Sequence, residues 1–309
     1  MPCQVVKVAD VARPFITELK TKVATLPSPP LLLAFLANDD PAARKYAEWT
    51  AKTCADTGLR FKLVECPRTE LEDRIVTANA DADVHGIMVY YPVFGGTQDG
   101  YIQNTVSHRK DVEGLCHKYR YNMYHNVRFL DAEKTEKCIV PCTPLALVKI
   151  LEHVGVYNRV LEEGDRLHGR TVTIVNRSEV VGRPLAALLA NDGAKVYSVD
   201  VDGIMELHRG TGLKLRKHEV FETKITLREA LAASDVVITG VPSPSYKIDT
   251  SQLKDGVVAV NFSTAKNFSD DITDKASIYV PSVGKVTVAM LERNLLRLHE
   301  YLVKNQGKD

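Results

Sequence analysis

The stretch that decides the fold reads Gly169-Arg170-Thr171-Val172-Thr173-Ile174-Val175-Asn176-Arg177-Ser178-Glu179-Val180-Val181-Gly182-Arg183-Pro184. Its β-branched first half predicts a buried strand, a polar turn follows, and the apolar run 185–190 predicts a helix. A second strand is expected over 195–200. This order of strand, turn, helix and strand predicts half of a doubly wound, Rossmann-type parallel sheet that binds a nucleotide.

Two acidic residues, Asp200 and Asp202, stand where the second strand is expected to end. An acid about 20 residues beyond the first turn commonly binds the adenosine ribose 2′-hydroxyl, so NAD is the expected cofactor. The turn lacks a complete G-x-G-x-x-G, because Asn176 occupies the place of the first glycine. A β-α-β unit without a ligand therefore remains an alternative.

Length and composition indicate an ordinary globular protein of two domains. The chain has 309 residues, of which 45% are hydrophobic and 26% charged. Forty Lys and Arg against 39 Asp and Glu leave a net charge of +1, which gives no electrostatic case for nucleic acid or an anionic membrane. No apolar run is long enough to span a bilayer, and the first residues lack the apolar region of a targeting peptide. We expect a cytoplasmic protein.

Cysteine and histidine usage predicts neither disulfides nor a metal site. None of the six cysteines forms a C-x-x-C pair, which is typical of reduced cytosolic thiols. The nine histidines form no H-x-x-x-H pattern or similar cluster with cysteine, so no metal is expected.

The first part of the chain also alternates strands and helices. Strands are expected over 31–36, 61–64 and 84–91, and helices over 42–57 and 71–79, which predicts a second parallel sheet. Tyr46, Trp49 and Thr50 lie on adjacent faces of the first of these helices. After an irregular region, 93–140, a helix is expected over 145–154.

The second domain is completed by a helix over 225–233 and strands over 235–240, 257–262 and 278–281, before a long amphipathic helix over 287–303. We expect this last helix to return to the first domain. The predicted domains are therefore 1–145 with 287–309, and 146–286.

Six separated motifs then carry a resemblance to one family. They are Asp40-Pro41-Ala42 with Tyr46, Val84-His85-Gly86-Ile87-Met88-Val89, Lys110-Asp111-Val112-Glu113-Gly114, Pro141-Cys142-Thr143-Pro144, the turn 176–184, and Thr287-Val288-Ala289-Met290-Leu291. In this order they resemble the methylenetetrahydrofolate dehydrogenases/cyclohydrolases over nearly the whole chain. The resemblance implies two α/β domains with a cleft between them, folate on the first, a dinucleotide on the second, and a homodimer.

Three residues depart from the bifunctional members of this family. Those members carry lysine where this chain has Thr50, glutamine where it has Tyr90, and usually aspartate where it has Glu113. The glycine-rich turn near the C-terminal helix is also shortened, to 282–285. The combination is similar to the monofunctional NAD-dependent branch.

The resemblance implies an oxidoreductase of one-carbon metabolism that oxidises 5,10-methylenetetrahydrofolate to 5,10-methenyltetrahydrofolate with NAD, without significant cyclohydrolase activity. Hydride transfer from the methylene bridge needs no general base, so the protein must mainly hold two rings face to face. Two alternatives remain: a bifunctional enzyme with an altered hydrolytic group, and a non-catalytic NAD-binding scaffold.

The candidate site residues fall into three groups. Tyr46, Thr50, Tyr90 and Glu113 are the catalytic candidates; Asp111, Val283, Gly284 and Lys285 are the folate-binding candidates; Thr143, Asn176, Arg177, Ser178, Val181, Gly182, Asp200, Asp202 and Gly240 are the cofactor-binding candidates. Structural alternatives stay open for several of them. Tyr46 fits a core-edge aromatic residue, Asp111 and Glu113 fit caps of their own loop, and Thr143 fits a helix cap.

Overall fold

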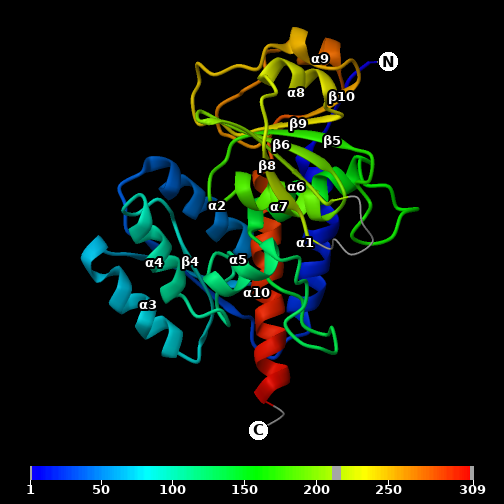
Figure 1. Ribbon diagram of the computed structural model, residues 1–309. Helices are drawn as coiled ribbons and strands as arrows, with labels where there is room; N and C mark the ends of the chain where they lie inside the picture. Colours follow the sequence, from blue (N-terminus) through cyan, green and yellow to red (C-terminus); the bar gives the residue numbers. More distant parts are fainter. Residues whose placement is uncertain (1, 211–216, 307–309) are drawn as a thin grey trace. The chain divides into compact units, whose positions relative to one another are not determined.

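The computed structural model describes residues 2–210 and 217–306 (Figure 1). Two compact units account for them. Unit 1 consists of Met1–Val11, Met123–Val127 and Thr143–Thr287, and unit 2 of Ala12–Asn122, Arg128–Cys142 and Val288–Asp309. The first residues fall in unit 1 because strand β1 (Gln4–Val5) pairs with a strand of that unit, β11 (Ala276–Val280). The expected first domain includes the C-terminal segment 287–309, of which residues 307–309 lie outside the residues that the structure describes.

The sheet of unit 2 is parallel, as the sequence predicts. Its described strands β2 (Leu31–Leu36), β3 (Arg60–Glu65) and β4 (Val84–Val89) lie in the order β3-β2-β4. The connecting helices are α2 (Pro41–Thr57) and α3 (Leu71–Ala80), the latter preceded by a 3-10 turn at Arg68–Glu70. The Asp40 carboxylate accepts from the N–H of Ala42 and so caps α2, and Gly58, with φ of 85°, ends it.

The irregular region that the sequence left unassigned contains two helices, α4 (Thr97–Thr105) and α5 (His117–Tyr124). Two further helices contain residues of both units. These are α1 (Val8–Ala24) and α10 (Gly284–Gln306), the second of which extends the helix expected over 287–303 at both ends.

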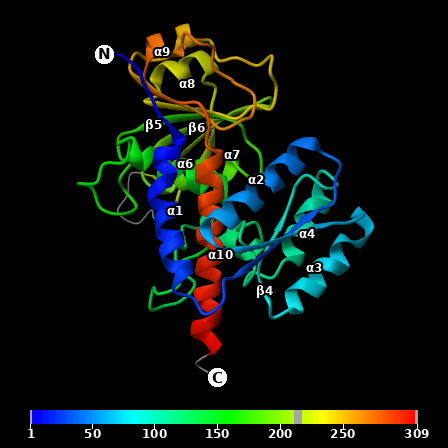
Figure 2. The ribbon, with the colours of Figure 1, turned by 180° about the vertical axis from the view of Figure 1, so that it is seen from behind.

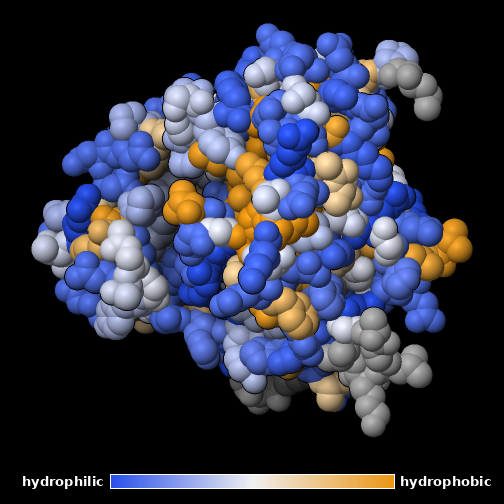
Figure 3. Space-filling model, turned by 45° about the horizontal axis from the view of Figure 1, so that its top comes forward, coloured by the Kyte–Doolittle hydropathy of each residue, from blue (hydrophilic) through white to orange (hydrophobic). Residues whose placement is uncertain are grey.

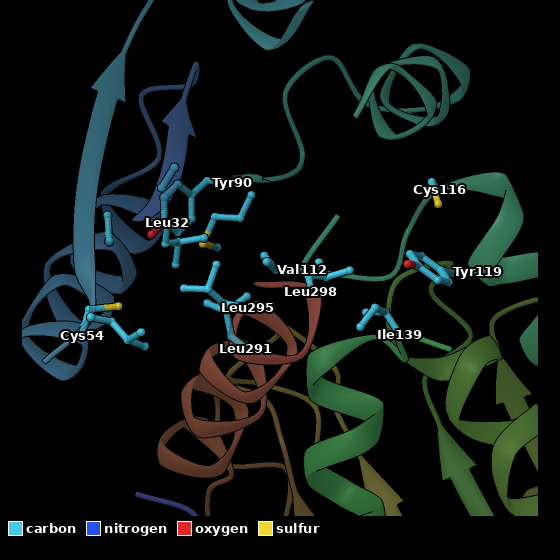
Figure 4. Close-up of a cluster of buried hydrophobic side chains, with 14 of the residues drawn as sticks. Leu32, Cys54, Tyr90, Val112, Cys116, Tyr119, Ile139, Leu291, Leu295 and Leu298 are labelled. Carbon is cyan, nitrogen blue, oxygen red and sulfur yellow. The ribbon is translucent and has the colours of Figure 1, made fainter. Parts of the chain in front are cut away.

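Both faces of the unit 2 sheet are buried, which explains the continuous apolar run of β2. On one face, Leu32 and Ala34 pack with residues of α2 and α10 (Figure 4). On the other face, Leu33 and Phe35 pack with residues of α3 and α4. Trp49 lies on the outer side of α2, with 47% of its surface exposed.

Gly86 allows the close packing of β4 under α10. A Cβ atom at Gly86 would lie 2.5 Å from Val112 Cγ1 and 2.6 Å from Leu295 Cδ1. Helix α10 also runs beside α1, as both ribbon views show (Figures 1 and 2). An ion pair between Arg293 and Glu18, 3.3 Å long, joins these two helices within unit 2.

Unit 1 contains the Rossmann-type sheet. Its described strands lie in the order β1-β11-β10-β9-β5-β6-β7-β8. The bounds not yet given are β5 (Thr171–Val175), β6 (Lys195–Asp200), β7 (Gly203–His208), β8 (Glu219–Glu222), β9 (Val236–Thr239) and β10 (Val257–Asn261). The helices are α6 (Cys142–His153), α7 (Gly182–Asn191), α8 (Leu227–Ala233) and α9 (Ile272–Lys275), with a 3-10 turn at Thr250–Gln252.

Besides the two-residue strand β1, the sequence analysis missed the strands β7 and β8 of this sheet. They pair antiparallel to β6 and to each other, whereas the strands from β1 to β6 in the sheet order are parallel. All four residues of β8 are exposed, and β7 mixes apolar with polar residues and buries only Leu207, so neither strand shows a continuous buried apolar run. The predicted parallel core of the sheet is confirmed, with an antiparallel edge added to it.

Hydrophilic side chains cover most of the face drawn in Figure 3. Within residues 2–210 and 217–306, no helix combines the length and apolarity that a membrane span requires. The six cysteines are free thiols, three of them buried.

Glu292 of α10 is a carboxyl group in the core of unit 2, and it should make stability depend on pH. It is fully buried, and neither carboxylate oxygen has a hydrogen-bond partner among the described residues. Burial is the largest cause of its shifted pKa, which it raises to about 7. The folded chain therefore keeps a proton that the unfolded chain has lost, and the stabilisation present below about pH 4 disappears as the pH rises through 7.

We expect Glu292→Gln, which cannot ionise, to gain stability relative to the natural chain as the pH rises. The gain between pH 5 and pH 8 should be on the order of 2 kcal/mol, measured as free energies of unfolding in denaturant. Glu300→Gln is the matched control, because Glu300 lies on the same helix with its side chain 48% exposed. Equal pH profiles for Glu292→Gln and the natural chain would show that Glu292 is ionised in the fold.

Candidate functional site

The catalytic candidates Tyr46, Thr50 and Tyr90 meet in unit 2. Tyr46 and Thr50 lie one turn apart on α2, and the Thr50 hydroxyl donates to the Tyr46 carbonyl over 2.9 Å. The rings of Tyr46 and Tyr90 meet edge to face, with centroids 6.0 Å apart and planes at 84°. Thr50 is fully buried and Tyr90 is 5% exposed. The sequence placed Tyr46 and Tyr90 on different elements, and the fold brings them into contact.

Tyr90 holds its place at the end of β4 through its backbone. Its N–H donates to the Phe35 carbonyl over 3.0 Å, and its carbonyl accepts from the Asn38 amide over 2.8 Å. The same amide donates to the Pro92 carbonyl across the cis peptide bond between Tyr91 and Pro92. The phenol oxygen of Tyr90 is buried and has no hydrogen-bond partner among the described residues. A buried donor without a partner is available for a bound molecule.

Glu113 adds an acid to this aromatic pair. Its Oε2 atom accepts from the N–H of Val89 over 2.9 Å. Burial raises its pKa to about 8, and the nearby Asp111 carboxylate adds to the rise while the Val89 bond opposes it. Burial also raises the pKa of Tyr46 well above its usual value, with contributions from Cys142, Tyr90 and Glu113. The cluster is therefore a half-buried, largely uncharged group of two phenols and one carboxyl at neutral pH.

Asp111 shapes the loop that carries Glu113. Its Oδ1 atom accepts from the N–H groups of Glu113 and Gly114, over 3.1 and 2.9 Å, and its Oδ2 atom accepts from Cys116 over 2.9 Å. These bonds fit the structural alternative of a loop cap. Gly114 has φ of 67°, and a Cβ atom there would lie 3.1 Å from the backbone of Pro141. Asp111 as a folate ligand stays a prediction, although both its oxygens already accept from the backbone.

Two neighbours of this cluster went unnoticed in the sequence as site residues. The Asn294 amide of α10 donates to the carbonyls of Val112 and Val140, over 2.9 and 3.0 Å. The Cys142 thiol donates to the Val112 carbonyl over 3.3 Å. Asn294 thus joins the Glu113 loop and the segment before α6 to one helix. No local sequence motif indicates this role of Asn294, because its partners lie far away in the chain.

In unit 1, Asn176 organises the turn between β5 and α7. Its amide donates to the Gly240 carbonyl over 3.0 Å, while its Oδ1 atom accepts from the N–H and the hydroxyl of Ser178. The Ser178 hydroxyl oxygen in turn accepts from the N–H groups of Val181 and Gly182 at 3.3 Å. The asparagine that interrupts the glycine motif therefore holds the turn through its side chain.

Two glycines permit close approach around this turn. A Cβ atom at Gly182 would lie 2.0 Å from the Asn176 carbonyl oxygen. A Cβ atom at Gly240 would lie 1.9 Å from the Phe262 ring. Both positions require glycine for steric reasons, since neither has a positive φ.

Asp200 ends β6 beside this turn, as predicted, because Val199 pairs with Val175 in the parallel ladder. Its Oδ1 atom accepts from the N–H of Val201 over 2.7 Å, and the side chain is exposed. Asp202 instead forms an ion pair with Arg177, with Nη1 and Oδ1 2.7 Å apart. The turn and the acidic strand end fit an adenosine diphosphate group, since crevices outside the carboxyl ends of parallel strands bind dinucleotides.

The other candidates are placed in unit 1 without a resolved role. Thr143 lies in the first turn of α6 rather than before it, so it does not occupy the capping position. Val283 is buried next to Gly284, the first residue of α10, and Lys285 is exposed. Folate binding by Val283, Gly284 and Lys285 stays a prediction.

Known proteins similar to this chain share both units. Residues 6–113 match the family described as tetrahydrofolate dehydrogenase/cyclohydrolase, catalytic domain, and residues 141–209 match the NAD(P)-binding domain of the same family. Methylenetetrahydrofolate dehydrogenase [NAD(+)] of Schizosaccharomyces pombe is 56% identical over 300 residues, which cover 97% of this chain and 94% of that protein. The bifunctional protein FolD of Prosthecochloris aestuarii is 27% identical, covering 91% of this chain and 90% of the relative.

A solved structure agrees with these matches. The NAD-dependent 5,10-methylenetetrahydrofolate dehydrogenase from Saccharomyces cerevisiae superposes with a TM-score of 0.94 at 51% identity, covering 99% of this chain and 100% of that one. The resemblance drawn from the motifs and the predicted fold class are both confirmed.

We expect Gly182→Ala to weaken NAD binding at least tenfold. The added methyl group would overlap the Asn176 carbonyl, so α7 must move away from the turn that Asn176 and Ser178 hold together. Calorimetric titration with NAD measures the loss. Gly100→Ala is the control, because Gly100 lies within α4 and a Cβ atom there meets nothing within 4 Å. Normal NAD affinity in Gly182→Ala would remove this turn from the cofactor site.

Proposed function

Because the chain belongs to the tetrahydrofolate dehydrogenase/cyclohydrolase family, we propose that it oxidises 5,10-methylenetetrahydrofolate to 5,10-methenyltetrahydrofolate with NAD as hydride acceptor. The observation that carries the proposal is the cluster of Tyr46, Tyr90 and Glu113. At Tyr90, and at Thr50 beside the cluster, the bifunctional members of the family that the motifs resemble carry a glutamine and a lysine. The names of the relatives from Schizosaccharomyces pombe and Saccharomyces cerevisiae support the same activity.

The residues of unit 2 suit the substrate half of this reaction. The two lone pairs on the nitrogens flanking the methylene bridge push the hydride out, and the product is a delocalised cation. NAD, when bound, supplies the carbon that accepts the hydride. Tyr46 offers a ring and a neutral phenol to orient the pterin, and Tyr90 offers its unpartnered hydroxyl.

Glu113 suits the positive charge that the substrate gains when it loses the hydride. With its pKa raised to about 8, it enters the reaction largely protonated and can donate to the substrate. The partial negative charge on the carboxyl oxygens of Glu113 favours a cation that forms nearby, so the side chain stabilises the product more than the reactant. No residue need remove a proton from carbon in this step.

In unit 1, Asn176, Ser178 and Gly182 shape the turn for the pyrophosphate, and Asp200 binds the ribose 2′-hydroxyl. We further propose that the chain acts in the cytoplasm as a homodimer. The exposed edge strand β8, with Val220 and Phe221 53% and 39% exposed, supports a partner surface in unit 1.

Tyr46→Ala should lower kcat/KM for methylenetetrahydrofolate by at least about tenfold, because the substrate loses its ring contact and Tyr90 loses its edge-to-face partner. The NAD dissociation constant should stay the same, since Tyr46 belongs to unit 2. Tyr46→Phe is the control that keeps the ring. Normal kinetics in Tyr46→Ala would mean that the folate binds elsewhere.

Cyclohydrolase activity should be absent or very weak. Hydrolysis needs a group that activates water and moves a proton, a contribution of roughly 10²–10⁴-fold. Thr50 does not titrate near neutrality, and burial raises the pKa of Tyr90 further above its usual value of about 10. When the protein is incubated with NAD and methylenetetrahydrofolate, NADH and the methenyl product should therefore accumulate at equal rates. Both are followed by their absorbance in the near ultraviolet.

The same assay separates the alternatives. A scaffold protein would produce no NADH, and a bifunctional enzyme would speed the decay of added methenyltetrahydrofolate above the buffer rate. The double variant Thr50→Lys, Tyr90→Gln is the fair attempt to restore hydrolysis, because Tyr90 occupies the place of the supporting amide in Thr50→Lys alone.

A further inference from the structure

Arg177 reaches from the turn after β5 to the hairpin that joins β6 and β7. Its Nη2 atom donates to the carbonyls of Ser198 and Gly203, over 2.7 and 2.5 Å, and Nε donates to the Ser198 hydroxyl over 3.4 Å. Its Nη1 atom donates to Asp202 Oδ1 over 2.7 Å. The Arg177 side chain is only 10% exposed. The guanidinium group is therefore anchored by backbone carbonyls and neutralised by one acid.

The two acids of the hairpin have different partners. Asp200 accepts from the N–H of its neighbour Val201 and forms no ion pair among the described residues. Asp202 is 71% exposed and carries the counter-charge of Arg177. The ribose position at the end of β6 thus lies beside a basic group whose charge is already matched.

We infer that Asp202 sets the preference for NAD over NADP by pairing with Arg177, as a positioning residue that acts through that side chain. The inference rests on the proposed function. A 2′-phosphate adds close to two negative charges and needs a free cationic donor near the ribose, a role that arginine commonly fills in NADP enzymes. Here Asp202 holds the donor atom Nη1 and cancels the charge of Arg177.

Removing the Asp202 charge should leave the guanidinium group in place. The carbonyls of Ser198 and Gly203 still accept from Nη2, so Arg177 remains oriented but lacks its counter-ion. Such an anchored cation is a ready anion site. Removing the charge of Asp200 has a different effect. It removes the repulsion between that carboxylate and the 2′-phosphate, while Arg177 stays neutralised by Asp202.

The test compares ligands with and without the 2′-phosphate on Asp202→Asn, Arg177→Gln and the double variant. Affinities for adenosine 2′,5′-bisphosphate and for AMP are measured by calorimetry, and kcat/KM is measured for NADP and NAD. We expect Asp202→Asn to raise both ratios in favour of the phosphorylated ligand at least tenfold, mainly through KM. The gain should shrink at high ionic strength and vanish in the double variant.

The controls separate the pairing from general charge effects. Asp255→Asn removes an acid from another surface ion pair of unit 1, with Lys275 at 2.8 Å, and should leave both ratios unchanged. Asp200→Ser should relax the preference less than Asp202→Asn, and its gain should persist in the Arg177→Gln background. Unchanged ratios in Asp202→Asn, or an equal gain in the double variant, would overturn the inference.

The two proposals fail in distinguishable ways. A chain that binds AMP but produces no NADH would refute the dehydrogenase and leave the ligand ratios to decide the role of Asp202. A chain that binds neither AMP nor the bisphosphate would refute both.

Discussion

A buried carboxyl group is costly unless N–H groups replace the water it loses, and this constraint governs unit 2. Asp111, Glu113 and Glu292 are all removed from water there, and burial raises the pKa of each. They differ in the donors they receive. Asp111 receives three backbone N–H groups, Glu113 receives one, and Glu292 receives none within the described chain.

The number of donors separates their roles. Asp111, fully bonded, fixes the loop that presents its neighbour. Glu113, with a single bond, keeps one oxygen available and a proton that can leave near neutral pH. Glu292 contributes a stability cost that rises with pH. The same burial therefore yields an acid that holds a loop, an acid with one free oxygen in the candidate site, and an acid whose burial costs stability as the pH rises.

The sequence was sufficient to predict those structural features that depend on a local pattern of residues. Apart from β1, the parallel strands of both sheets and the acid at the end of β6 follow from periodicity and turn chemistry, and the structure contains them. Contacts between segments far apart in the chain could not be predicted in this way. Nothing local indicates that Asn294 bonds to Val112, or that Arg177 pairs with Asp202. The antiparallel edge of unit 1 was missed because its strands lack a continuous buried apolar run.

The position of Trp49 has a spectroscopic consequence. It is the single tryptophan of the chain, and it lies half exposed on α2, within unit 2. Tyr46, which precedes Trp49 by three residues on the same helix, belongs to the candidate site. Tryptophan emission excited near the red edge of the absorption band therefore originates in unit 2 alone. The chain carries an intrinsic fluorophore through which the unfolding of one unit can be followed without any signal from the other.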